Sequence, residues 1–245
     1  MNLDWNYYFE DVEENEIFSK VTVGVTKALD IFSVSKNFIE EIEKSGKQNI
    51  NTNKIEDGVT IKGSVYIGEG TEIERGCIIQ GPVYIGKNCK LMYNSYIRPG
   101  TILGDDCVVG FCSEAKNTIM RDGSKVSDLA FVGDSIIGKN SRIGSGVIVA
   151  NRGFNQSNII LKDENKETID SKREFLGVIL GDNSRVGSNA TVSPGTFIGK
   201  YTWIYPHTCV HGFIPELKKV YDKQNLVFAE NPKKTLYKST EYNYQ

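Results

Sequence analysis

Three polar side chains stand out in this sequence because folding alone does not require them: Arg98, Lys116 and Asn151. Arg98 and Lys116 each directly follow an aliphatic residue, and they lie 18 residues apart. Arginine recognises a phosphate with a planar fork of donors, and lysine recognises it as a point charge, so the pair suits a phosphorylated ligand. Whether the three side chains can meet depends on the elements that carry them.

Those elements belong to a six-residue repeat. An aliphatic residue recurs every six residues from 55 to 149, with two five-residue steps, and the pattern returns from 180 to 210. A short fixed period indicates a solenoid, and a six-residue period indicates a β-helix. The 23 positions are Ile55, Ile61, Ile67, Ile73, Ile79, Ile85, Leu91, Ile97, Leu103, Val109, Ala115, Met120, Val126, Val132, Ile137, Ile143, Val149, Leu180, Val186, Val192, Ile198, Ile204 and Val210.

Each repeat is typical of a short strand that ends at a corner. A small residue commonly stands two positions before the aliphatic residue, and a glycine often follows it. Alternate large and small side chains can fill a narrow interior, and glycine accepts the backbone angles of a corner. An amphipathic helix is excluded because its apolar stripe needs a 3.6-residue spacing. In the β-helices that this repeat resembles a coil holds three repeats, and Arg98, Lys116, Asp134 and Asn151 are then expected along one corner.

The repeat resembles the hexapeptide-repeat family, whose members form left-handed parallel β-helices with three flat faces. The resemblance implies an all-β fold: a left-handed parallel β-helix with an N-terminal helical segment and a protruding loop. The 23 positions correspond to nearly eight coils. At a strand spacing of ~4.8 Å the prism would be roughly 35 Å long.

Composition narrows the function classes. A net charge of −2 argues against a nucleic-acid partner. No apolar run approaches the ~20 residues that cross a bilayer, and the acidic N-terminus lacks the layout of a signal peptide. We therefore expect a cytoplasmic protein with no membrane partner. Cys77, Cys89 and Cys107 occupy the small interior position, whereas Cys112 and Cys209 do not; no zinc-ligand spacing occurs, so no metal is expected.

Residues 1–50 precede the repeat. Helical spacing of apolar residues predicts one helix that ends at Gly46, and the stretch from Phe18 to Val23 is interpreted as a short strand. The open first coil of a solenoid needs a terminal cap, so we expect this segment to supply it. A partner-binding role is the alternative.

The β-helix itself is expected over residues 51–214, followed by a tail at 215–245. A polar loop at 150–179 interrupts the repeat. Loops of this length in compact folds are usually functional. The alternatives are a solvated hairpin and a clasp between the subunits of a trimer.

A more specific resemblance lies in the segments 96–101 (YIRPGT), 114–117 (EAKN) and 131–134 (FVGD), and in Asn151. Together they look like the acetyltransferase domain of bifunctional glucosamine-1-phosphate acetyltransferase/uridylyltransferase. Residues 168–204 are more similar to archaeal sugar-phosphate nucleotidyltransferases. The resemblance covers about residues 55–210, and it implies that Arg98 and Lys116 hold a sugar phosphate while Asn151 contacts the sugar.

The same resemblance implies a coenzyme A-dependent N-acetyltransferase or N-acyltransferase for an amino-sugar phosphate or nucleotide-linked amino sugar. Acetyl-CoA would be the co-substrate, with its pantetheine arm near Ser188, Thr202 and Pro206. The active cleft would lie between the subunits of a homotrimer. No glycine-rich nucleotidyltransferase fingerprint occurs, so nucleotidyl transfer by this chain is not expected.

The chain departs from this family at the general base. Where the family has Asn-His-Leu, this sequence has Ser127-Asp128-Leu129, and Phe131 replaces a tyrosine. Asp128 could accept the proton of the amine or only orient its ammonium group. His207, reached from a neighbouring subunit, is a second candidate base. The alternative function is a catalytically silent β-helix that binds sugar phosphate or regulates and assembles a separate nucleotidyltransferase.

Overall fold

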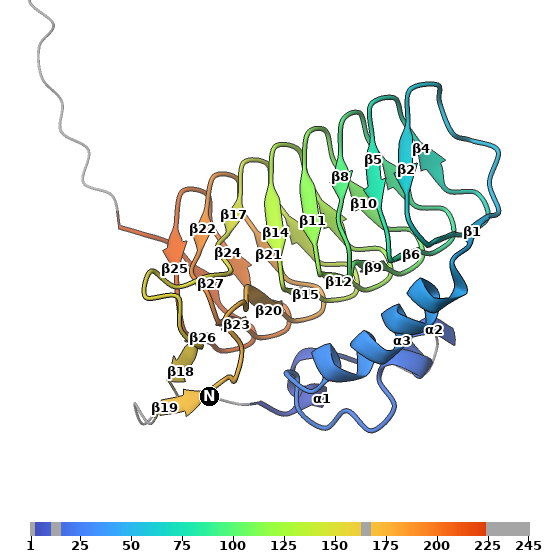
Figure 1. Ribbon diagram of the computed structural model, residues 1–245. Helices are drawn as coiled ribbons and strands as arrows, with labels where there is room; N and C mark the ends of the chain where they lie inside the picture. Colours follow the sequence, from blue (N-terminus) through green and yellow to red (C-terminus); the bar gives the residue numbers. More distant parts are fainter. Residues whose placement is uncertain (1–2, 11–15, 163–167, 224–245) are drawn as a thin grey trace, which may run out of the picture.

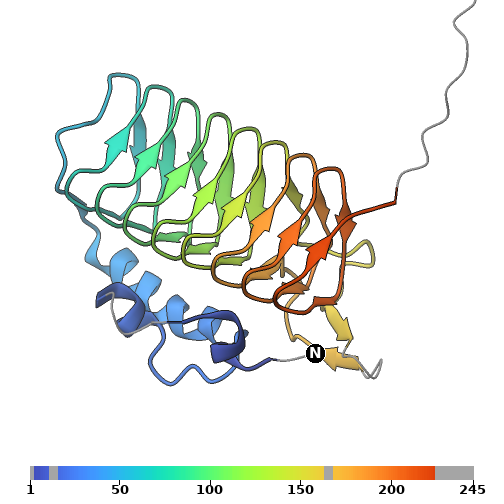
Figure 2. The ribbon, with the colours of Figure 1, turned by 180° about the vertical axis from the view of Figure 1, so that it is seen from behind.

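The computed structural model describes residues 3–10, 16–162 and 168–223. Its backbone winds into a three-sided prism whose faces are three parallel sheets (Figures 1 and 2). We call these sheets A, B and C. Each coil adds one strand to sheet A, then one to sheet B and then one to sheet C. Most of the expected tail, residues 224–245, lies outside the described residues.

The three sheets have nine, eight and eight strands. Sheet A contains, in order, β1 (Gln48–Ile50), β3 (Val65–Ile67), β6 (Val83–Ile85), β9 (Ile102–Leu103), β12 (Ile119–Met120), β15 (Ile136–Ile137), β20 (Val178–Leu180), β23 (Thr196–Ile198) and β26 (Phe213–Ile214). Sheet B contains β4 (Glu72–Ile73), β7 (Lys90–Leu91), β10 (Val108–Val109), β13 (Lys125–Val126), β16 (Arg142–Ile143), β21 (Arg185–Val186), β24 (Trp203–Ile204) and β27 (Lys219–Val220). Sheet C contains β2 (Thr60–Lys62), β5 (Ile78–Gln80), β8 (Tyr96–Ile97), β11 (Glu114–Lys116), β14 (Phe131–Gly133), β17 (Ile148–Val149), β22 (Thr191–Val192) and β25 (Cys209–Val210).

The fold is the left-handed parallel β-helix that the repeat and its family resemblance predict. It extends slightly beyond the predicted boundaries, because β1 precedes residue 51 and β27 follows residue 214. These extra strands also raise the number of coils above the nearly eight that were expected. The repeat pattern misses these two strands because their apolar residues do not continue the six-residue spacing.

The repeat residues line the interior of the prism. From Ile67 onward every one of them is buried and belongs to a single core. Ile55 and Ile61, in the first coil, are only partly buried. Cys77, Cys89 and Cys107 are completely buried, as their repeat position predicts. Burying a large aliphatic side chain contributes about 1.5–3 kcal/mol, so the repeat supplies most of the driving force for coiling.

The two five-residue steps both occur where sheet C turns into sheet A, at what we call the C–A corner. Asn117 and Asp134 occupy these shortened turns with positive φ angles of 45° and 50°. Strand register is nevertheless preserved, since Ala115 pairs with Val132 and Val132 pairs with Val149. The positions counted from the sequence are therefore retained in space.

The N-terminal segment folds into α1 (Trp5–Tyr8), α2 (Glu16–Val21) and α3 (Ile31–Ser45). The predicted helix is α3, and it ends at Gly46, whose φ of 61° is the left-handed conformation that glycine adopts readily. The expected strand from Phe18 to Val23 is wrong. Most of this stretch is helical because Phe18 and Val21, three residues apart, face the same way on α2 and are both buried.

This segment covers a side of the prism and not its open first coil, which corrects the expected terminal cap. In Figures 1 and 2 the helices run along the coils beneath sheet A. The outward residues of sheet A are apolar, and they form a second core with the N-terminal segment. They include Tyr84, Ile102, Ile119, Ile136, Ile179 and Phe197. A large apolar outer face must be covered. This requirement explains why the N-terminal segment packs on sheet A and not on the open first coil.

A buried ion pair fastens the N-terminal segment to the coils. The Nη1 atom of Arg121 donates to both carboxylate oxygens of Asp182 at 2.7 Å, and its Nη2 atom donates to the carbonyl of Glu10 at 2.6 Å. The guanidinium also lies 5.4 Å and 5.7 Å from the ring centres of Phe9 and Phe18. Burial raises the pKa of Asp182, and the nearby Arg121 opposes that rise.

The predicted loop leaves the prism between β17 and β20 and carries an antiparallel hairpin of β18 (Ile160–Lys162) and β19 (Thr168–Asp170). The hairpin is not simply solvated, because Ile159, Leu161 and Leu176 are buried in the second core. Among the residues the structure describes, no helix is both long and apolar enough to cross a bilayer.

Candidate functional site

The C–A corner brings together the residues that the sequence placed there. The backbone N–H of Arg98 donates to the carbonyl of Ala115 at 2.9 Å, and the N–H of Asp134 donates to the carbonyl of Lys116 at 2.9 Å. Arg98, Lys116, Asp134 and Asn151 therefore follow one another in successive coils. The stacking results from the parallel register of β8, β11, β14 and β17.

Asp134 is the centre of this corner. Its side chain is only 5% exposed, and it accepts hydrogen bonds from the amides of Asn117 and Asn151, both at 2.6 Å. The Nζ atom of Lys116 lies 3.5 Å from the same carboxylate. A buried carboxylate is stable only when donors and opposite charge surround it. Asp134 thus fixes the positions of two predicted substrate-binding side chains, Lys116 and Asn151.

Arg98 is less available for binding a phosphate than the sequence suggested. Its Nη1 atom lies 2.6 Å from Glu114 of the next coil, and this hydrogen bond raises the pKa of Arg98 above its ordinary value. Arg98 and Lys116 therefore do not face each other as uncompensated charges, since each has a carboxylate beside it. The stacked cations alone do not require an anionic ligand at this corner.

The loop adds two residues that the predicted site lacked, Arg152 and Phe175. They pair as an antiparallel bridge where the chain leaves and re-enters the prism, which we call the loop neck. The ring centre of Phe175 lies 4.5 Å from the Nζ atom of Lys116 and 5.0 Å from the guanidinium carbon of Arg152. Their signal in the sequence is weak, because both lie in the gap where no repeat relates them to the corner.

Backbone contacts hold the loop neck against the corner. The N–H of Leu176 donates to the carbonyl of Asn151 at 2.9 Å, and the N–H of Gly177 donates to the carbonyl of Asp134 at 2.8 Å. A Cβ atom on Gly177 would lie 2.2 Å from the carbonyl oxygen of Gly133 and 2.2 Å from the hydroxyl of Ser135. Only glycine permits this close approach, so the returning chain is fixed beside the candidate site.

Arg173 ties the loop neck to the N-terminal segment. Its guanidinium carbon lies 4.3 Å from the ring centre of Phe32 on α3, and its Nε atom donates to the carbonyl of Phe175 at 3.3 Å. Burial lowers the pKa of Arg173, an effect that the charge of Asp134 opposes. The N-terminal segment thus supports the loop neck in addition to covering sheet A.

Asp128, the first candidate base, lies at a different corner, where sheet B turns into sheet C (the B–C corner). Its Oδ1 atom accepts the backbone N–H of Phe111 in the preceding coil at 3.0 Å. Asp105 accepts the N–H of Lys87 in the same way at 2.7 Å, at the corner between sheets A and B. This carboxylate–backbone contact is a recurring device of the coil corners, which explains an aspartate at residue 128 without catalysis.

The residues expected near the cofactor do not form one group. Ser188 and Pro206 stand on the B–C corner, as does His207, whose N–H donates to the carbonyl of Ser188 at 3.1 Å. His207 lies three coils beyond Asp128 on that corner, or roughly 14 Å at ~4.8 Å per coil. Thr202, in contrast, is completely buried at the corner between sheets A and B. It fills the interior and cannot line a surface groove with Ser188.

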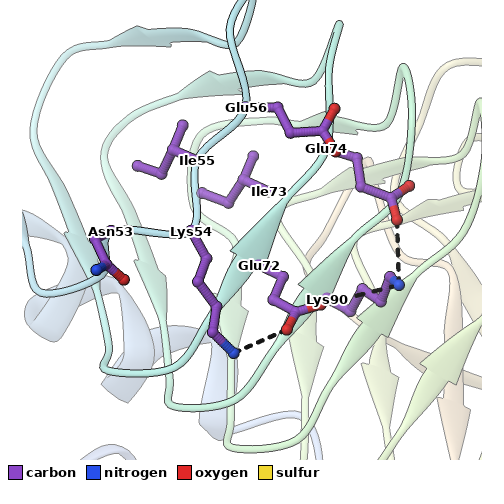
Figure 3. Close-up of a pocket in the computed structure, with 8 residues that line it drawn as sticks. All are labelled: Asn53, Lys54, Ile55, Glu56, Glu72, Ile73, Glu74 and Lys90. Carbon is purple, nitrogen blue, oxygen red and sulfur yellow. Dashed lines mark hydrogen bonds and ion pairs between the residues drawn. The ribbon is translucent and has the colours of Figure 1, made fainter.

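A hollow elsewhere on the molecule is a weaker candidate for a ligand site than the C–A corner. One of about 450 Å³ lies on the first coils of sheet B, the face opposite the C–A corner (Figure 3). Its charges pair with each other, Lys54 with Glu72 at 2.9 Å and Lys90 with Glu74 at 3.2 Å. Within the described residues, no group of three or more histidine, cysteine, aspartate or glutamate side chains could hold a metal ion.

The fold and the residues of the C–A corner define the class of protein to which this chain belongs. Residues 79–168 match the model of the GMPPB C-terminal domain, and residues 176–200 match the hexapeptide repeat of succinyl-transferase. The chain belongs to the hexapeptide-repeat family of acyltransferases.

Within that family, two archaeal relatives illustrate the likeness. The chain is 38% identical to "Bifunctional protein GlmU" of Methanococcus aeolicus, over 85% of this chain and 49% of the relative. It is 41% identical to the bifunctional sugar-1-phosphate nucleotidylyltransferase/acetyltransferase of Sulfurisphaera tokodaii, over 77% of this chain and 46% of the relative. The chain thus spans about half the length of these relatives.

Among solved structures, the UDP-N-acetylglucosamine acyltransferase of Francisella novicida is similar with a TM-score of 0.40 and 18% identity. The match covers 70% of this chain and 63% of that one.

Proposed function

We propose that this protein is a coenzyme A-dependent N-acyltransferase for an amino-sugar phosphate or a nucleotide-linked amino sugar, with acetyl-CoA as the acyl donor. The observation that carries the proposal is the C–A corner, where Lys116 and Asn151 are held by one buried carboxylate, Asp134. Relatives at 38% and 41% identity, one of them named as an acetyltransferase, support it.

In this proposal the side chains at the corner bind and orient the sugar. The ammonium group of Lys116 offers a positive charge to a phosphate, and Arg98 can add a second charge through the donors that Glu114 does not use. The amide of Asn151 keeps its carbonyl oxygen free for a sugar hydroxyl while its nitrogen donates to Asp134.

The transfer forms one bond and breaks another. The neutral amine attacks the thioester carbonyl, a C–N bond forms, and the C–S bond breaks to release the coenzyme A thiolate. The nitrogen loses a proton, which ends on that thiolate. Asp128 would accept and pass on the proton, and His207 is the second candidate; a well-placed base contributes typically 10²–10⁴-fold.

The B–C and C–A corners belong to different edges of one prism, so the proposal includes a homotrimer that brings them together between subunits. Exposed apolar residues on the B–C corner support a contact there. Tyr93, Phe111 and Leu129 are 45%, 42% and 60% exposed on successive coils. Exposed apolar stripes are typical of protein–protein contacts. The assembly would work in the cytoplasm.

Release of the coenzyme A thiol tests the proposal directly. Purified protein is incubated with acetyl-CoA and a panel of amino-sugar phosphates and nucleotide-linked amino sugars, and the free thiol is titrated with time. We expect release with at least one member of the panel. If no member of the panel releases the thiol at high enzyme concentration, the proposed function is wrong.

One observation favours a second candidate, a catalytically silent subunit that binds sugar phosphate for a separate nucleotidyltransferase. The carboxylate of Asp128 already accepts the backbone N–H of Phe111, so this side chain is not devoted to proton transfer. Calorimetry separates the two functions. The silent subunit would bind a sugar phosphate without binding acetyl-CoA, whereas the enzyme binds both.

A further inference from the structure

The loop neck carries a third cation, Arg152, to the C–A corner, beside Arg98 and Lys116. Arg152 is exposed, and its Nη2 atom donates to the side-chain oxygen of Gln156 at 3.2 Å. No carboxylate of the described residues lies within ion-pair distance of it, in contrast to Arg98, which pairs with Glu114. Arg152 is therefore a guanidinium at the candidate site whose charge is not compensated.

Phe175 contacts both Arg152 and Lys116. Both cations lie against its ring, at 5.0 Å and 4.5 Å from the ring centre. Attraction between a cation and the face of an aromatic ring stabilises each of these contacts. Lys116 has Asp134 beside it, whereas the charge of Arg152 is not compensated, so the arrangement favours a ligand that carries negative charge.

The backbone that carries the ring of Phe175 is held in place before any ligand binds. Leu176 is completely buried, Gly177 is hydrogen-bonded to Asp134, and Arg173 donates to the carbonyl of Phe175. Side chains held in place bind a ligand without a further loss of conformational freedom, which improves affinity. The loop is thus a fixed wall of the corner.

We infer that Lys116, Arg152 and Phe175, which we call the Phe175 cluster, form the phosphate-binding part of the substrate site. Arg152 would give forked hydrogen bonds to phosphate oxygens, and Lys116 a point charge. The inference rests on the proposed function for the sugar that carries the phosphate. It assigns phosphate recognition to the loop neck, with Arg98 in a secondary position.

Binding of small phosphates tests the cluster without catalysis. Calorimetry is performed with glucosamine 1-phosphate, glucosamine 6-phosphate, inorganic phosphate and unphosphorylated glucosamine. Arg152→Met keeps the apolar stem against Phe175 but removes the charge, and Arg142→Met, at an exposed arginine of sheet B, is the matched control. We expect Arg152→Met to weaken phosphorylated probes about tenfold, the loss of one charged hydrogen bond, and to leave glucosamine unchanged.

A second variant, Phe175→Leu, tests the ring. It preserves an apolar side chain at the loop neck but removes the face that attracts both cations, and we expect it also to weaken the phosphorylated probes selectively. Thermal unfolding midpoints close to that of the unsubstituted protein verify that both variants fold.

Three results would overturn the inference. They are an unsubstituted protein that binds no phosphorylated probe at millimolar concentration, an Arg152→Met variant that binds them like the Arg142→Met control, and an equal loss for phosphorylated and free sugar. Phosphate binding without any coenzyme A release would instead contradict the proposed function and leave the cluster intact. Coenzyme A release with phosphate binding insensitive to Arg152→Met would do the reverse.

Discussion

The side-chain amide of Asn151 donates to the buried carboxylate of Asp134 at 2.6 Å, although 17 residues and one full coil separate them. The same carboxylate also accepts from Asn117 at 2.6 Å and lies 3.5 Å from Lys116. One acidic group thereby organises three donors from the two neighbouring coils. Its loss should disturb every part of the candidate site at once.

We therefore expect Asp134→Ala to destabilise the protein by about 1–3 kcal/mol, because it leaves buried amide donors without an acceptor. The measurement is urea-induced unfolding. Asp57→Ala, at an exposed turn of the first coils, serves as the control and should change stability little. Equal stability of the two variants would show that Asp134 does not hold the corner together.

Gly177→Ala should displace the loop neck. The added methyl group would lie 2.2 Å from the carbonyl oxygen of Gly133, a contact that the backbone must move to relieve. Overpacking of this kind costs about 1–3 kcal/mol. Gly153→Ala, in the same loop, is the control, since its nearest neighbour would lie at 3.1 Å. Thermal unfolding should separate the two variants; a Gly177→Ala midpoint equal to that of Gly153→Ala contradicts the prediction.

Asp128→Asn separates catalysis from structure. Asparagine keeps an acceptor for the N–H of Phe111, so the fold should be preserved, while the capacity to take a proton is lost. If Asp128 is the base, kcat for coenzyme A release falls about 10²–10⁴-fold. Asp105→Asn, which alters the equivalent contact with Lys87, should leave kcat unchanged. An Asp128→Asn variant with full activity would exclude Asp128 as the base.

Arg121→Met should loosen the N-terminal segment. Breaking a buried pair by removing one partner costs ~3–5 kcal/mol, here by leaving the Asp182 carboxylate uncompensated. Trp5 reports the change because it is 4% exposed in the docked segment, whereas Trp203 is already 43% exposed. We expect red-shifted fluorescence and faster proteolysis near the N-terminus. Emission like that of the Arg142→Met control would argue against this role of the pair.

The same segment should also respond to pH through Glu10. A hydrogen bond from Lys200, at 2.8 Å, lowers the pKa of Glu10 below its ordinary value near 4.5. A lowered carboxyl pKa gives stability that is present above the ordinary value and lost as pH falls through the lowered one. Unfolding midpoints between pH 6 and about pH 3 should therefore fall less steeply in Glu10→Gln than in the unsubstituted protein. Identical slopes would show that Glu10 does not contribute.

The sequence by itself determined the β-helix, its register and, with the three repeats per coil that the family resemblance implies, the corner shared by Arg98, Lys116, Asp134 and Asn151. This was possible because each coil packs only on its neighbours, so a six-residue spacing translates directly into position. A further signal was present in pairs such as Ile102-Leu103 and Ile136-Ile137, since adjacent strand residues point to opposite sides. They mark sheet A as apolar on its outer face as well, and so as a face that another segment must cover.

The tertiary structure decided the placement of the segments that no repeat spacing relates to the coils. The N-terminal segment and the loop lie outside the repeat, so only packing could place the helices on sheet A and bring Arg152 and Phe175 to Lys116. Packing likewise decided that Arg98 is paired with Glu114. A repeat specifies where the backbone runs, whereas the environment of a side chain depends on every element that packs against it.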